Sequence, residues 1–85
     1  METARKGPSL REQKKQAKLA AIEEAARSLF RSQGYARTTT REIAERASIG
    51  VGPLFVYFPE KTDLLFFVFS HELERVANRA LDSIS

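Results

Sequence analysis

The stretch GYARTTTREIAERASIGVGPLFVYFPEKTDLL, residues 34–65, decides the fold of this chain. Within it, Thr39 and Glu42 have the spacing of a capping box, which predicts that a helix begins here and runs to Ala47. A Ser-Ile-Gly turn follows, and residues 51–58 form a second short apolar segment. The pattern therefore predicts two short helices joined by a tight turn.

A longer helix is predicted before this pair. Ser9 and Glu12 match another capping box, and the glycine and proline just before them mark the end of an N-terminal arm. From Lys18 onward the apolar residues follow a helical period. The residues on this stripe are Ile22, Ala25, Ala26, Leu29 and Phe30. Gly34 suits the left-handed conformation that caps a helix, and Tyr35 is expected to pack back against the helix.

Glycine and proline also mark the limits of the second short helix. Gly50 lies in the turn before it, and Pro53 is tolerated in its first turn because backbone N–H groups there have no partner within the helix. Leu54 and Phe58 are four residues apart and are expected to form its buried edge. Pro59 ends this segment, so a fourth helix is expected to begin directly after it.

The fourth helix carries an unbroken apolar run at residues 64–69. Consecutive side chains point all round a helix, whereas a small domain covers only one side of it. We expect Leu65 and Val68, with Phe69, to close the core, which leaves Phe66 or Phe67 exposed unless something else packs on them. An apolar stripe continues beyond the small domain at Leu73, Val76, Ala80 and Ile84. We therefore expect the chain to be the front portion of a longer protein, or to use a partner chain.

Length and composition limit the class of protein. A chain of 85 residues forms one small domain, and the absence of cysteine excludes disulfides and thiolate metal sites. No apolar run approaches the roughly 18 residues of a membrane span, and the N-terminal residues do not resemble a signal peptide. We expect a soluble, cytoplasmic protein that binds no membrane.

The net charge of +3 is unevenly distributed. Two acidic residues, Glu2 and Glu12, lie among the first 18 residues, whereas the basic residues there are Arg5, Lys6, Arg11, Lys14, Lys15 and Lys18. A basic front end suits a polyanionic partner, but a solvated tail that aids solubility explains it equally well.

No constellation of residues predicts catalysis. His71 is the only histidine and has no nucleophile or metal ligand at a suitable spacing. Residues 50–52 superficially suggest a phosphate loop, but neither a preceding strand nor a following G-K-[ST] supports this. We therefore expect no enzyme, no catalytic residue, no metal and no cofactor.

Many residues of the chain together match a known pattern. They are Ala26, Leu29, Phe30, Gly34, Tyr35, Thr38, Thr39, Ile43, Ala44, Ala47, Gly52, Leu54, Tyr57, Phe58, Lys61, Leu64 and Leu65. With this spacing, the stretch from about Lys18 to Phe69 resembles the DNA-binding domain of the tetracycline-repressor (TetR) family of bacterial transcriptional regulators.

The resemblance implies an all-α fold, a three-helix helix-turn-helix domain plus the start of a long fourth helix. Residues 1–17 would be a flexible basic arm and the start of helix one, and 18–60 the DNA-binding domain. Residues 61–85 would lead to a ligand-binding and dimerisation domain absent from this chain. The implied function is sequence-specific binding of double-stranded DNA, most often as a repressor that acts as a homodimer on a palindromic operator. A small-molecule effector would bind the absent domain.

Four residues at the start of the first short helix, and Lys61 after the second, are candidate phosphate ligands. The hydroxyls of Thr38, Thr39 and Thr40 lie where the free N–H groups of a helix start also favour an anion, although each threonine equally suits a plain cap. Arg41 lies in the first turn, where it is expected to reach a phosphate or a base edge. Lys61 matches the lysine with which the family clamps a phosphate.

The second short helix is expected to enter the major groove. Val51, Gly52 and Pro53 offer no side-chain hydrogen bonds, so this turn is expected to read thymine methyl groups by apolar contact. Phe55 stands where family members commonly carry tyrosine, so a phosphate-binding hydroxyl is missing. Tyr57 keeps a hydroxyl and is the leading candidate contact on this helix.

A second interpretation remains open. The chain would be a helical interaction module, in which the basic first helix lies on an anionic membrane or an acidic protein and the Phe-rich helix docks in a groove. That interpretation gives the threonines, the glycines and Lys61 no purpose. Steep salt dependence on duplex DNA, without binding to anionic vesicles, separates the two.

Overall fold

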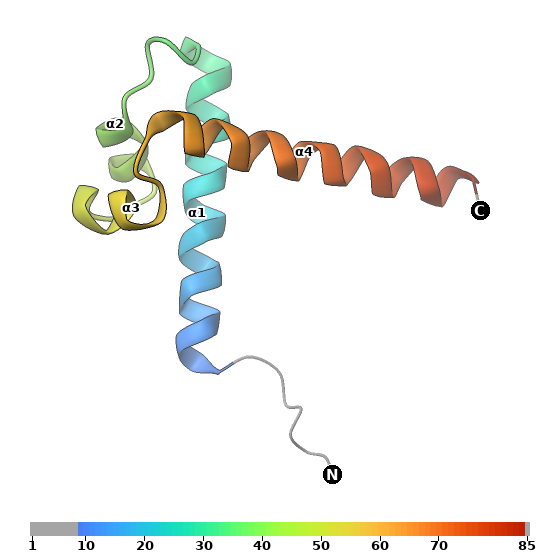
Figure 1. The fold of residues 1–85 in the computed structure, drawn as a ribbon, viewed down its shortest axis with the longest axis horizontal. Coiled ribbons are helices and arrows are strands. Elements are labelled where there is room, and N and C mark those ends of the chain that lie inside the picture. The colour runs from blue at the N-terminus through green and yellow to red at the C-terminus, as the bar shows by residue number, and fades with distance from the viewer. Residues whose placement is uncertain (1–8, 85) are drawn as a thin grey trace.

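The computed structural model describes residues 9–84, which form four helices and no strand in this part of the chain. The helices are α1 (Leu10–Gln33), α2 (Thr40–Arg46), α3 (Val51–Tyr57) and α4 (Lys61–Ile84). The long helices α1 and α4 cross each other, and the short α2 and α3 pack to one side of the crossing (Figure 1). This confirms the predicted all-α architecture. The predicted arm lies mostly outside the described residues.

The predicted caps set the ends of α1. The Ser9 hydroxyl accepts a hydrogen bond from the Glu12 N–H at 3.2 Å, which satisfies a free donor of the first turn. At the other end, the Gly34 N–H donates to the Phe30 carbonyl at 3.0 Å. Gly34 has a φ of 87°, as predicted for glycine, but its ψ of 154° is extended and not left-handed helical. The ring of Tyr35 packs back on Phe30, with 5.3 Å between their centroids.

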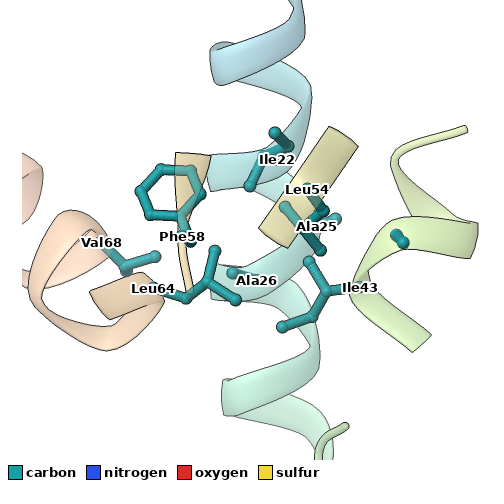
Figure 2. Close-up of a cluster of buried hydrophobic side chains, with 9 residues drawn as sticks. Ile22, Ala25, Ala26, Ile43, Leu54, Phe58, Leu64 and Val68 are labelled. Carbon is teal, nitrogen blue, oxygen red and sulfur yellow. The ribbon is translucent and has the colours of Figure 1, made fainter. Parts of the chain in front are cut away.

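The hydrophobic core lies where α1, α2 and α3 meet the first turns of α4 (Figure 2). Its buried residues are Ile22, Ala25, Ala26, Ile43, Ala44, Leu54, Phe58, Leu64 and Val68. Three of these are alanines, whose small side chains let the helices approach closely. The stripe predicted for α1 and the buried edge predicted for α3 are confirmed, although Leu29 and Phe30 are only half-buried.

The predicted inward face of α4 is partly wrong. Leu64 is fully buried, whereas Leu65 is only half-buried, and Phe69 is 58% exposed. Phe67 packs against the core in place of Phe69. The reason is geometric, because Leu64, Phe67 and Val68 follow the i, i+3, i+4 spacing of one helix face. Six consecutive apolar residues contain such a face in more than one register.

A second face of α4 is apolar and exposed. The large residues on it, with their exposed fractions, are Phe66 (64%), Phe69 (58%), Leu73 (55%), Val76 (57%) and Leu81 (62%). Of the expected apolar stripe beyond the small domain, Leu73, Val76 and Ala80 are therefore exposed, and the side chain of Ile84 lies outside the described residues. Neither 24-residue helix has an apolar stretch that could span a bilayer in the described part of the chain.

A cluster of charged residues joins α1 to α4 where they cross. The carboxylate of Glu23, which is only 7% exposed, accepts from Arg27 at 3.1 Å and from Arg75 at 3.3 Å. Arg27 also lies 3.4 Å from Glu72. His71 contacts this cluster, with its Nδ1 3.6 Å from a Glu23 oxygen. The buried carboxylate therefore has cationic partners from both helices, and the cluster links α4 to α1.

Candidate nucleic-acid interface

The turn between α2 and α3 is stabilised by its backbone. The N–H groups of Ser48 and Ile49 donate to the carbonyls of Glu45 and Ala44 at 3.1 and 2.9 Å. Ser48 has a φ of 58°, so the left-handed residue of the turn is this serine and not Gly50, whose φ is −66°. Ser48 could not be recognised from the sequence, because serine is not the residue that a positive φ usually favours.

Gly50 has a different role at the start of α3. It is the residue before the helix, and its carbonyl accepts from the Leu54 N–H at 3.2 Å. A Cβ at Gly50 would lie 3.2 Å from the Cδ of Pro53, a tighter contact than side chains usually make. Gly50 and Pro53 thus fit together, because the glycine leaves room for the proline ring in the first turn.

The predicted capping box begins α2. The Thr39 hydroxyl accepts from the Glu42 N–H at 3.1 Å, and the Glu42 carboxylate accepts from the Thr39 N–H at 3.0 Å. The Gln33 side chain donates to the same carboxylate at 2.9 Å, which ties the end of α1 to the start of α2. The proton of the Thr39 hydroxyl remains available to a phosphate oxygen, because the hydroxyl acts as the acceptor in the box.

Replacing Thr39 by alanine is expected to lower the free energy of unfolding by about 1 kcal/mol, because the Glu42 N–H loses its acceptor. Urea denaturation of the chain measures this change. Thr40→Ala is the matched control, since it removes the neighbouring hydroxyl and leaves the capping box intact. Equal losses in the two variants would show that the box does not stabilise α2.

Thr38 does not fit its predicted role. Its side chain is only 1% exposed, and its hydroxyl lies 2.8 Å from the Gly34 carbonyl and 3.2 Å from that of Leu29. A hydroxyl has one proton, and here that proton is donated within the domain. Thr38 therefore closes the α1–α2 loop, and we withdraw it from the candidate phosphate ligands. Thr40 is half-buried, whereas Thr39 and Arg41 are exposed at the start of α2.

The Lys61 ammonium turns inward, toward the α1–α2 loop. Its Nζ donates to the carbonyls of Tyr35 at 2.8 Å and Thr38 at 3.0 Å, and lies 3.5 Å from that of Ala36. It also lies 4.3 Å from the centroid of the Tyr35 ring, a cation–π contact. Lys61 thus holds the loop that leads into α2. Binding a phosphate would require the ammonium to share or leave these carbonyls.

The outer face of α3 is open and uncharged. Leu54 is its buried anchor, and Val51 and Tyr57 are half-buried. Gly52 and Pro53 are exposed, as are Phe55 and Val56. The helix carries no acidic or basic side chain, so it presents apolar atoms and one phenol to whatever it meets.

The domain has two short helices, a tight turn between them, and an outer face of the second helix that the rest of the domain leaves uncovered. These features define a helix-turn-helix DNA-binding domain. Comparison with known proteins agrees with this class. The family described as "Bacterial regulatory proteins, tetR family" matches residues 22–67, just over half of the chain. The chain belongs to the TetR family of helix-turn-helix transcriptional regulators, and this part of it is the DNA-binding domain.

Curated relatives support the same family. The chain is 40% identical over 58 residues to the HTH-type transcriptional repressor KstR of Rhodococcus jostii (strain RHA1). The matched segment covers 68% of this chain and 27% of the relative. It is 40% identical over 50 residues to the HTH-type transcriptional regulator HbdR of Aromatoleum sp. (strain CIB), covering 59% and 22%. It is 35% identical over 61 residues to the uncharacterised HTH-type regulator YuxN of Bacillus subtilis (strain 168), covering 72% and 21%.

The chain thus spans between about a fifth and just over a quarter of the length of these relatives. No solved structure gave a significant match to it.

Proposed function

We propose that this chain is the operator-binding part of a transcriptional repressor, which binds a palindromic DNA site as a homodimer. The observation that carries the proposal is α3, whose single fully buried residue, Leu54, fixes the helix while its outer face stays open. A helix held in this way is suited to enter a major groove without rearrangement of the core. One relative, KstR, is named as a repressor.

We propose two groups of DNA contacts. The hydroxyls of Thr39 and Thr40 bind phosphates at the start of α2, together with Arg41 and with Lys61, whose ammonium lies beside this helix start. Tyr57 binds a phosphate at the last turn of α3. Apolar contact with thymine methyl groups at the start of α3 comes from Val51, Gly52 and Pro53. Because no charged side chain of α3 reads base edges, base discrimination rests on these contacts, on Arg41 and on DNA shape.

The proposed dimer places two α3 helices in successive major-groove faces, about 34 Å apart for one helical turn. In the full-length protein, dimerisation and binding of a small-molecule effector would belong to a C-terminal domain. The exposed apolar face of α4, which includes Phe66 and Leu73, is consistent with packing against such a domain.

The test is fluorescence anisotropy with random-sequence duplex DNA across a salt series. We expect affinity to fall steeply as salt rises, because phosphate contacts release counterions. Anionic vesicles are the control, and we expect no binding to them. A fusion of two copies, joined through a dimerising coiled coil, is tested alongside, because one copy supplies only half of the proposed contacts. Binding of this fusion to vesicles but not to DNA would favour the interaction module instead.

A further inference from the structure

The first turns of α1 extend beyond the core. All residues from 10 to 18 are exposed, and the first fully buried residue of the helix is Ile22. This segment therefore contributes little to the packing of the domain. It is nevertheless helical and carries most of the charge of α1. Packing of the core therefore does not account for its charged residues.

Its basic residues share one helix face. They are Arg11, Lys14, Lys15 and Lys18, which we call the basic ridge. Their separations of three, four and seven residues are those of neighbours on one side of a helix. Like charges at this spacing repel one another, so the ridge costs stability unless an anion lies against it.

The basic ridge faces the end of α3. Its four residues, together with Leu10 and Tyr57, line one groove between the start of α1 and α3. Tyr57 is the last residue of α3, the helix that we propose enters the major groove. In Figure 1, α3 and the N-terminal turns of α1 lie on the same side of the crossing with α4, and these turns extend beyond α3. Within residues 9–84, no acidic residue lines this groove.

We propose that the basic ridge binds the phosphates of the DNA strand that borders the major groove at the Tyr57 end of α3. This inference rests on the proposed function and adds a second contact surface to it. The ridge supplies the positive charge that α3 lacks, since no residue of Val51–Tyr57 is charged. Such contacts set affinity and orientation and carry no base preference.

The composition of the segment favours DNA over a membrane surface. An amphipathic helix that binds a bilayer needs a broad apolar face beside its cations. Residues 10–18, LREQKKQAK, offer only Leu10 and Ala17 as apolar side chains. A polyanion that needs charge and no apolar insertion therefore fits this surface, as the duplex backbone does.

The experiment compares two double variants that lose the same charge. The ridge variant is Lys14→Gln with Lys18→Gln, and the control is Arg31→Gln with Arg79→Gln, on exposed residues outside the groove. Glutamine keeps helix propensity close to that of the residues replaced. Affinity of the two-copy fusion for random-sequence duplex DNA is measured against salt, and thermal denaturation verifies that each variant is folded.

We expect the slope of log affinity against log salt to become shallower by about 1.8 per copy in the ridge variant, at about 0.9 for each lost phosphate contact. Affinity at 0.1 M salt should fall by more than about tenfold, whereas the control changes little.

Equal slopes in the two variants would overturn the inference and leave the proposed function intact, provided that the unmodified fusion binds DNA. Failure of that fusion to bind would count against the proposed function itself. Loss of vesicle binding with unchanged DNA binding would assign the ridge to a membrane and also overturn the inference.

Discussion

Replacing Leu54 by alanine is expected to lower the free energy of unfolding by about 3 kcal/mol, the typical cost of a buried leucine truncated to alanine. Leu54 is fully buried, and it is the only such residue within α3. The loss should be measured by urea denaturation followed by far-ultraviolet circular dichroism. For a domain of this size, it removes a large part of the total stability.

The same substitution is expected to abolish DNA binding even when the other helices remain folded. A helix of seven residues is not stable alone in water, so α3 depends on the packing of Leu54 to stay helical and oriented. Val56→Ala is the matched control on the same helix, because Val56 is 79% exposed. Its stability should stay within about 0.5 kcal/mol of the original chain. A Leu54 variant as stable as the Val56 variant would show that α3 is held by contacts other than its single buried side chain.

Local signals in the sequence predicted much of the fold. The capping box of Thr39 and Glu42 and the glycine at position 34 are determined by residues only a few positions apart, so the sequence displays them directly. The apolar stripe of α1 is similarly local, because polar residues separate its buried face from the exposed one. These features correctly placed the helices and most of the core.

Prediction was poorer where local pattern leaves a choice. In the run at residues 64–69 no polar residue marks the outer face, so Leu65 was expected in the core where the structure places Leu64. The three consecutive threonines pose the same difficulty. Only the packing of the α1–α2 loop shows that Thr38 points inward while Thr39 caps α2.

The role of Lys61 within the domain could not be predicted, for a different reason. Its partners are backbone carbonyls 26 and 23 residues away, at Tyr35 and Thr38. Because every residue has a backbone carbonyl, the residue type does not indicate which carbonyl will accept a hydrogen bond from Lys61. The sequence shows a lysine after Pro59, and the resemblance to the family supplies only an expected contact with DNA.

Lys61→Met is expected to lower the free energy of unfolding by about 2 kcal/mol in the absence of DNA, because two short hydrogen bonds from a charged group to half-buried carbonyls are lost. Methionine keeps most of the aliphatic stem, so the change isolates the ammonium. Lys18→Met is the matched control, since Lys18 is exposed on α1. Thermal or urea denaturation without DNA measures both variants, and we expect the control to stay within about 0.5 kcal/mol of the original chain.

The salt dependence of DNA binding separates this internal role from the proposed phosphate contact. If Lys61 also binds a phosphate, Lys61→Met should lower the salt slope by about one per copy. If its role is confined to holding the loop, affinity falls because the start of α2 is displaced, and the slope is unchanged. An unfolding free energy equal to that of the Lys18 variant would contradict the internal role, because the contacts with Tyr35 and Thr38 would then contribute nothing to stability. Because the unfolding free energy is measured without DNA, it tests the internal role of Lys61 whatever the salt slope of DNA binding is.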